Sequence, residues 1–299
     1  MYNVGFNTIS YPQYRVQTLQ HRTNTVNNST NTSCPEMLDI KTIDCFDSKA
    51  LKTRQLRKLY RLFSKDELKS IYNSINKDFG IDNPAKLKFV NNKNTGIGGG
   101  YNFFNNKIKM DLADLVDSNT KIIGIKNGKA TLLTSPTEKL PLFVDRKSAQ
   151  AFVNKQALAD NMGFDKLVIA PVTRDEHRKF IIQKIAHEII HSQQHMIMRK
   201  SDSVGSKEII KAWNKERVEN PFLRAYYNFR IYFAYTKKAL EKESIATKTL
   251  ANDEIAKKFL CAVQEYGHFG AKNYFQNTLE TDANERAAAY ITNKYGAWN

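Results

Sequence analysis

The sequence predicts an α+β fold in which a small, mainly antiparallel sheet packs on one long helix and a long helical C-terminal half follows. Three patterns predict this arrangement. Apolar residues recur with a period near 3.6 in residues 48–79, two hairpin patterns lie between residues 101 and 134, and helical periodicity resumes near residue 174. The predicted order along the chain is therefore helix, small sheet and helices.

The first helical pattern, in residues 48–79, contains an internal break. Ser64 followed by Glu67 is a capping-box pattern, in which each side chain accepts a hydrogen bond from the other residue's backbone N–H. One helix is therefore expected to end before Ser64 and a second to begin after it. Gly80 is the expected stop of the second helix, because glycine readily adopts the left-handed conformation common at helix ends.

Six short segments have the composition of strands, and tight turns join two pairs of them. Asn127-Gly128 is the strongest turn signal, since both residues tolerate the positive φ of a type I′ hairpin. Asn105-Asn106 is a second turn, and the glycine-rich stretch Gly96–Gly100 precedes its hairpin. The expected strands are Lys86–Val90, Tyr101–Phe104, Lys107–Leu112, Lys121–Lys126, Lys129–Thr134 and Leu167–Ala170.

From Thr173 onward the pattern is helical. Thr173 is a good N-cap with Glu176 three residues later, and the helix is expected to run to about Met198. Aromatic residues at helical spacing usually pack in a core, so we expect that role for a group in the third of these helices. The group comprises Phe222, Tyr226, Tyr227, Phe229, Tyr232, Phe233 and Tyr235. The later helices are expected at residues 206–219, 221–244, 252–266 and 280–294.

The composition indicates a folded protein without a cysteine framework. Hydrophobic residues make up 41% of the 299 residues, which supports a substantial core. The three cysteines, Cys34, Cys45 and Cys261, form no CxxC pair, which argues against disulfides and against a cysteine-based zinc site. The formal net charge is +16, but the lysines are spread along the chain rather than clustered as in nucleic-acid patches.

Residues 1–35 are rich in Asn, Thr, Ser and Gln and are expected to form a disordered leader. Residues 36–299 are expected to form a single domain with a helical insertion at about residues 200–270. No stretch reaches 18 apolar residues, so no membrane span is expected. The N-terminus lacks the pattern of a secretory signal, so a cytoplasmic location is the default expectation and signal-less export stays open.

The residues that carry chemistry begin with the motif His187-Glu188-Ile189-Ile190-His191. Two histidines four residues apart lie on one face of a helix, so both imidazoles can reach one zinc ion. Glu188 flanks that face, where its carboxylate can take a proton from a water molecule at the metal. The motif predicts a zinc-dependent metallopeptidase with Zn²⁺ as cofactor and a peptide or protein as substrate. His187 and His191 would bind the metal, and Glu188 would be the general base.

A catalytic zinc ion usually has three protein ligands, so a third ligand is needed. His195 lies on the same face but about 12 Å along the helix axis from His187, so we expect a supporting or structural role for it. Glu280 opens a downstream helix whose small residues allow close packing against the histidine helix, and it is the preferred third ligand. Asp282 and Glu285 are rival ligands in the same segment.

The segments HEIIHSQQ and LETDANERAAAY together resemble the gluzincin metallopeptidases, including the small bacterial zincin domains of the ImmA/IrrE type. The resemblance is confined to these two segments. It implies a zincin-like fold in which His187, His191 and Glu280 are the metal ligands and Glu188 is the base. It also implies that Asn284, four residues after Glu280, orients a ligand histidine.

Several alternatives stay open. A SprT-like, DNA-associated protease would use His268, in a glycine-flanked turn, as the third ligand, and a non-catalytic basic nucleic-acid-binding protein would need no zinc. Tyr274, His268 and Tyr290 are candidate donors to the oxyanion that forms during peptide hydrolysis. The hairpin at residues 101–112 is a candidate edge with which a substrate peptide pairs. The sequence does not separate a housekeeping protease from a toxin.

Overall fold

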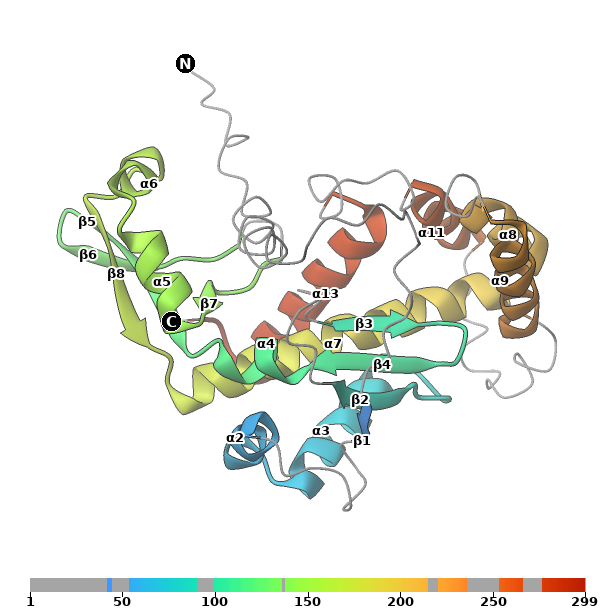
Figure 1. Ribbon diagram of the computed structural model, residues 1–299, viewed down its shortest axis with the longest axis horizontal. Helices are drawn as coiled ribbons and strands as arrows, with labels where there is room; N and C mark the ends of the chain where they lie inside the picture. Colours follow the sequence, from blue (N-terminus) through green and yellow to red (C-terminus); the bar gives the residue numbers. More distant parts are fainter. Residues whose placement is uncertain are drawn as a thin grey trace, which may run out of the picture.

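The computed structural model describes residues 42–44, 54–90, 99–135, 138–214, 220–235, 253–265 and 276–298. The leader predicted for residues 1–35 lies outside them. The described residues form two small sheets and a set of helices, and the part that follows the sheets is helical (Figure 1). The predicted α+β class and the helical C-terminal half are therefore confirmed.

The first sheet contains a parallel strand pair that the mainly antiparallel prediction did not include. Its order is β1-β2-β4-β3, with β2 parallel to β4 and the other neighbours antiparallel. The predicted hairpin is present, since Gly99 pairs with Met110 and Asn102 with Lys107. Strand β3 runs opposite to β4, and β4 lies beside β2 and runs in the same direction as β2. The strands are β1 (Thr42–Asp44), β2 (Lys86–Val90), β3 (Gly99–Asn102) and β4 (Lys107–Asp111).

The second sheet is antiparallel, and its strand β5 pairs with β6, β7 and β8. Asn127 and Gly128 have φ values of 49° and 74°, which confirms the predicted hairpin turn with two residues of positive φ. A Cβ at Gly124 would lie 2.5 Å from the ring of Phe164, so glycine allows that ring to pack on the strand. The strands are β5 (Thr120–Lys126), β6 (Lys129–Leu132), β7 (Phe143–Val144) and β8 (Lys166–Pro171).

Two N-terminal helices, α2 (Arg54–Leu62) and α3 (Lys65–Asp78), are separated at the predicted break. The capping box is present, because the Ser64 side chain accepts from the Glu67 N–H and the Glu67 carboxylate accepts from the Ser64 N–H. Both helices contribute to the largest core cluster, in which Leu59 is fully buried. Burying one such leucine stabilises the fold by about 1.5–3 kcal/mol.

Helix α7 (Arg174–Lys200) is the central element of the fold (Figure 1). Its predicted capping box is present: Thr173 accepts from the Glu176 N–H, and the Glu176 carboxylate accepts from the Thr173 N–H. The same carboxylate lies 2.6 Å from the Lys121 ammonium of β5. Helices α3, α11 and α13 and strands β3 and β4 all pack on α7. Side chains on several faces of α7 are therefore buried.

In the described part of the chain, four further helices follow α7, and the last of them packs against it. Ala283 and Ala287 of that helix, α13, are buried in the largest core cluster, as their small size predicted. The others lie around the C-terminal part of α7 (Figure 1). The predicted helix ends near residues 219, 244 and 266 lie outside the described residues. The bounds are α8 (Ser206–Asn214), α9 (Pro221–Ala234), α11 (Asp253–Glu265) and α13 (Thr278–Tyr295).

The prediction that the aromatic residues of α9 lie in the core is wrong for most of them. Ile231 and Tyr235 are buried, and they join the second core cluster with α8 and α11. The reason is helical register, because only the face that carries Ile231 points inward and most of the aromatic residues lie on other faces. The exposed fractions are 85% for Phe222, 52% for Tyr226, 60% for Phe229, 56% for Tyr232 and 56% for Phe233.

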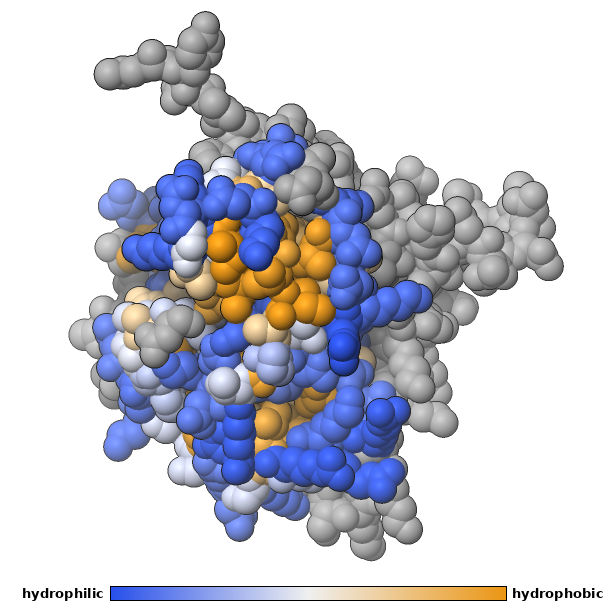
Figure 2. Space-filling model, turned by 90° about the vertical axis from the view of Figure 1, so that its left-hand side faces the viewer, coloured by the Kyte–Doolittle hydropathy of each residue, from blue (hydrophilic) through white to orange (hydrophobic). Residues whose placement is uncertain are grey.

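The second sheet forms the opposite end of the molecule, where α5 (Arg146–Val153) and α6 (Gln156–Asn161) pack on it. Figure 2 faces this end and shows hydrophobic residues gathered within a hydrophilic border. Along β5, Ile122 is buried while Ile123 and Ile125 are half-buried, so the two faces of the strand differ in burial. Among the described residues, no helix has both the length and the apolar character needed to cross a membrane.

Candidate metal centre

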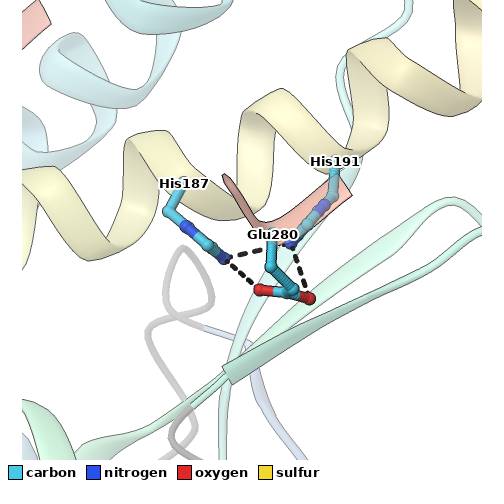
Figure 3. A group of neighbouring side chains, drawn as sticks. All are labelled: His187, His191 and Glu280. Carbon is cyan, nitrogen blue, oxygen red and sulfur yellow. Dashed lines mark hydrogen bonds and ion pairs between the residues drawn. The ribbon is translucent and has the colours of Figure 1, made fainter. Parts of the chain in front are cut away.

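Two helices bring three potential metal ligands together. His187 and His191 lie one turn apart on α7, and their Nε2 atoms are 3.0 Å apart. Glu280 lies in the first turn of α13, with Oε2 3.3 Å from His187 Nε2 and Oε1 3.5 Å from His191 Nε2. The three side chains point toward one another (Figure 3). The structure thus forms a His-His-Glu group whose ligand atoms all lie within 4.8 Å of one another.

These distances fit a tetrahedral metal ion. Ligand atoms 2.0–2.1 Å from zinc at tetrahedral angles lie roughly 3.3–3.4 Å apart. The three separations of 3.0, 3.3 and 3.5 Å are close to that edge length. Two imidazoles and one carboxylate are also the donor set of a catalytic zinc site that keeps a fourth position for water or substrate. His187, His191 and Glu280 therefore fit a zinc ion in both geometry and chemistry.

The group is buried and strongly coupled. Glu280 is 2% exposed, and although burial raises its pKa, the charges and hydrogen bonds of His191 and His187 outweigh this and hold that pKa well below its usual value. Burial lowers the pKa of His191, but the Glu280 carboxylate outweighs burial and raises that pKa to about 9. In the metal-free protein, an ionised carboxylate is therefore paired with a charged imidazole.

Local structure explains why Glu280 reaches the histidines. Asn277 caps α13, since its side chain accepts from the Leu279 N–H. The Asn277 amide also donates to the Ala262 carbonyl of α11, which fixes the start of α13. Ala283 then packs in the core cluster that includes α7, and its small side chain permits a close approach. A capped and anchored first turn therefore holds Glu280 over α7.

Glu188 lies beside the triad and has an unusual environment. Its carboxylate is buried, and within the described residues its Oε2 atom has no hydrogen-bond partner. Burial raises the pKa of Glu188 above its usual value, and the neighbouring His187 and His191 charges oppose that rise. A Cβ at Gly99 would lie 3.0 Å from Glu188 Oε1, so strand β3 passes close to this carboxylate. Glu188 thus has an acceptor oxygen available for a proton.

Gln194 is a residue that the sequence interpretation missed. It is fully buried, and its side-chain oxygen lies 2.8 Å from His191 Nδ1. Its amide nitrogen donates to the Leu279 carbonyl at 2.9 Å and to the Asp282 carboxylate at 2.8 Å. Because both amide hydrogens of Gln194 are donated to these acceptors, its side-chain oxygen must accept the hydrogen bond from His191 Nδ1. His191 Nδ1 therefore carries a hydrogen, and Nε2 faces the triad. The sequence feature that could have identified Gln194 is its position three residues after His191, about one turn along the same face of the helix.

The other predicted ligands and supporting residues lie elsewhere. His195 stacks on Phe103, with ring centroids 4.5 Å apart, and its Nδ1 lies 2.8 Å from the Tyr235 hydroxyl, outside the triad. Asn284 is buried on α13, but no hydrogen bond joins it to either histidine in the described part of the chain. The rival ligand Asp282 accepts from Gln194 and Arg286, and Glu285 is exposed.

Of the three candidate oxyanion donors, the described residues include only Tyr290, and its hydroxyl is bonded away from the triad. The Tyr290 hydroxyl donates to the Asp78 carboxylate of α3 at 3.0 Å, and its ring lies 5.4 Å from that of Phe79. His268 and Tyr274 lie outside the described residues.

Comparison of the chain with family models, with curated proteins and with solved structures found no match. The chemistry of the candidate centre is therefore argued from its own residues.

Proposed function

We propose that this protein is a zinc-dependent metallopeptidase of the gluzincin kind that hydrolyses peptide bonds in a peptide or protein. The observation that carries the proposal is the convergence of His187, His191 and Glu280 beside the buried carboxylate of Glu188. This set of groups contains the three ligands and the base that zinc-dependent peptide hydrolysis requires. The zincin-like architecture and the single domain spanning residues 36–299 are part of the same proposal.

The two histidines and Glu280 would hold the zinc ion. When bound, zinc supplies Lewis acidity that polarises a carbonyl group and lowers the pKa of water. Gln194 holds the ring of His191 in the orientation in which Nε2 faces the ion. The ionised Glu280 carboxylate supplies the negative charge that partly neutralises the cation.

Glu188 would move the protons. Its Oε2, which has no hydrogen-bond partner among the described residues, accepts a proton from the attacking water and passes it to the nitrogen of the departing amine. The same carboxylate would act first as a general base and then as a general acid, so the proton that it takes up is the one that it delivers. Burial near strand β3 also limits the access of bulk water to this carboxylate.

Strand β3 would bind the substrate. It is the last strand in the sheet order β1-β2-β4-β3, so within the described residues its outer edge pairs with no strand. It packs on α7, and Gly99 lies against Glu188. A peptide added to this edge by backbone hydrogen bonds would run beside the triad.

Metal content tests the ligand set. Purified full-length protein should contain about one zinc ion per chain when measured by atomic spectroscopy after exchange into zinc-containing buffer. Glu280→Gln should lower the zinc affinity by at least tenfold, because a carboxylate ligand is lost from the triad. Glu285→Gln removes an exposed carboxylate from the same helix and should leave the affinity unchanged. A wild-type protein that takes up no zinc contradicts the proposal.

Hydrolysis of a peptide library tests the catalytic role. Glu188→Gln should lower turnover by at least about a thousandfold while zinc stays bound, since the base is removed and the ligands remain. Mass spectrometry of the digested library reports both activity and cleavage site. Wild-type activity in Glu188→Gln would exclude Glu188 as the base even if the zinc site is correct.

A further inference from the structure

Helix α9 carries an aromatic stripe, which we define as Phe222, Tyr226, Phe229 and Phe233. The intervals between these residues are four, three and four, so they lie along one side of the helix. Every member is more than half exposed, whereas Ile231 on the opposite side is fully buried. The helix therefore packs on the protein through a narrow face and presents its most aromatic face to the surroundings.

The C-terminal part of the aromatic stripe forms one group of contacting rings. The rings of Phe229 and Phe233 lie 4.6 Å apart between centroids, and Tyr232 adds a ring 5.9 Å from Phe233. Single exposed apolar residues are common on protein surfaces, but a contiguous exposed group marks a surface that meets another molecule or a membrane. Helix α9 lies at one end of the molecule (Figure 1), and the side chains of the stripe are exposed.

The charge next to the aromatic stripe is positive. Helix α9 contains Arg224 and Arg230 and no Asp or Glu. Arg230 donates to the Tyr226 hydroxyl at 2.8 Å, and its guanidinium carbon lies 5.7 Å from the centre of the Tyr226 ring. A cation is thus fixed at the edge of the stripe, on a chain whose formal net charge is +16. The complementary partner has an apolar interior and an anionic surface.

We propose that the aromatic stripe of α9 binds the surface of a membrane that contains anionic lipids. Phenylalanine rings insert at the boundary between headgroups and acyl chains, and tyrosine and arginine side chains bind at the level of the lipid phosphates. The stripe forms a ridge along one helix, which suits a deformable planar surface better than the groove that a partner helix would require. This inference is independent of the proposed peptidase activity.

Membrane binding at α9 would also orient the candidate metal centre. Phe104, in the turn between β3 and β4, has its ring centroid 5.8 Å from that of Tyr227 and 6.0 Å from the Arg230 guanidinium carbon. The hairpin that carries β3 is therefore in contact with α9. A bound membrane would hold that hairpin, and the triad beside it, near the membrane surface.

Vesicle co-sedimentation of the full-length protein tests the proposal. The vesicles contain phosphatidylcholine alone or phosphatidylcholine with about one third phosphatidylserine, at physiological salt concentration. Wild-type protein should partition at least tenfold more strongly onto the anionic vesicles. Phe229→Ser combined with Phe233→Ser should reduce that partition at least tenfold, because two inserted rings are lost. Arg230→Gln should reduce it about fivefold, as expected for one basic group near an anionic surface.

The control is Ile255→Ser, which removes an apolar side chain that is 40% exposed on α11 and should leave binding unchanged. Thermal unfolding of each variant should match the wild type, and Phe222→Ser provides a second variant at the most exposed position of the stripe. Equal partition of wild type and the double variant overturns the proposal. The proposal is also overturned if the wild-type protein does not bind vesicles and the stripe instead binds a second copy of the chain or a nucleic acid. In that case the double variant would abolish dimerisation, measured by light scattering, or oligonucleotide binding.

Discussion

Replacing Gln194 with methionine should weaken zinc binding by about 10- to 100-fold, the usual effect of removing a partner that orients a metal ligand. The wild-type side chain is fully buried and bonds to His191 Nδ1, the Leu279 carbonyl and the Asp282 carboxylate. Methionine has a similar length and fills the same space without a strong donor or acceptor. The change therefore removes the polar contacts and leaves the packing largely intact.

The expected loss of affinity corresponds to about 1.4–2.7 kcal/mol. The fold itself should lose about 2–4 kcal/mol, because one buried carbonyl and two partly buried side chains lose a hydrogen-bond partner. Only the bond to His191 touches a proposed metal ligand. The measurement must therefore separate the weaker metal binding from the lower stability of the protein.

Gln193 provides the matched control. It is the neighbouring residue on α7, it is also buried, and it donates to the Phe79 carbonyl and accepts from Arg286. Gln193→Met should lower stability by a similar amount, about 2–3 kcal/mol, while the zinc dissociation constant stays within about threefold of wild type. Competition with a chromophoric chelator gives the dissociation constants, and thermal unfolding of the metal-free proteins gives the stabilities.

The comparison has a clear negative outcome. If Gln194→Met and Gln193→Met have the same zinc affinity, Gln194 only stabilises the contact between α7 and α13 and does not orient His191. If the wild-type protein itself binds no zinc, the proposed metal site fails rather than the role of Gln194.

Two further changes test the base and the start of α7. Gly99→Ala should lower turnover at least tenfold with zinc retained, since its Cβ would lie 3.0 Å from Glu188 Oε1, whereas Gly100→Ala enters open space and should be neutral. Glu176→Gln should cost about 1 kcal/mol at pH 7. Burial raises the pKa of Glu176, but the hydrogen bonds from Lys121 and Thr173 outweigh it and lower that pKa. In urea unfolding, this difference should therefore shrink as the pH falls below 4.5, the ordinary pKa of glutamate, and vanish once the pH is below the lowered pKa of the folded state. A difference that persists in acid would exclude the carboxylate as its source.

Features set by neighbouring residues were predicted well. The capping boxes at Ser64 and Thr173, the turn at Asn127-Gly128 and the close spacing of His187 and His191 all depend on residues within four positions of each other. Their backbone geometry is therefore determined locally. The position of Glu280 beside the two histidines was predicted differently, because the small residues after Glu280 indicated a helix that could pack closely on α7.

Features that depend on distant contacts were missed. The parallel pairing of β2 with β4 follows from the path of the chain through β3, which no local pattern encodes. Gln194 is adjacent in space to Leu279 and Asp282 only because α13 lies along α7. The exposure of the aromatic face of α9 likewise depends on which face meets its neighbours, and the spacing of the residues is the same for a buried helix.

Removing the metal should lower the stability of the protein without unfolding it. Helix α13 is held to the rest of the fold by the Asn277–Ala262 and Gln194–Leu279 hydrogen bonds and by buried Ala283, none of which needs a metal ion. Within the triad, the positive charge of His191 balances the negative charge of the buried Glu280 carboxylate.

Zinc at about a thousand times its dissociation constant would add about 4 kcal/mol to stability through selective binding to the folded state. Chelation should therefore lower the melting temperature while the helical circular dichroism signal at 25 °C stays unchanged. Loss of that signal would mean that the metal, rather than the packing of α13 on α7, determines the fold of this region.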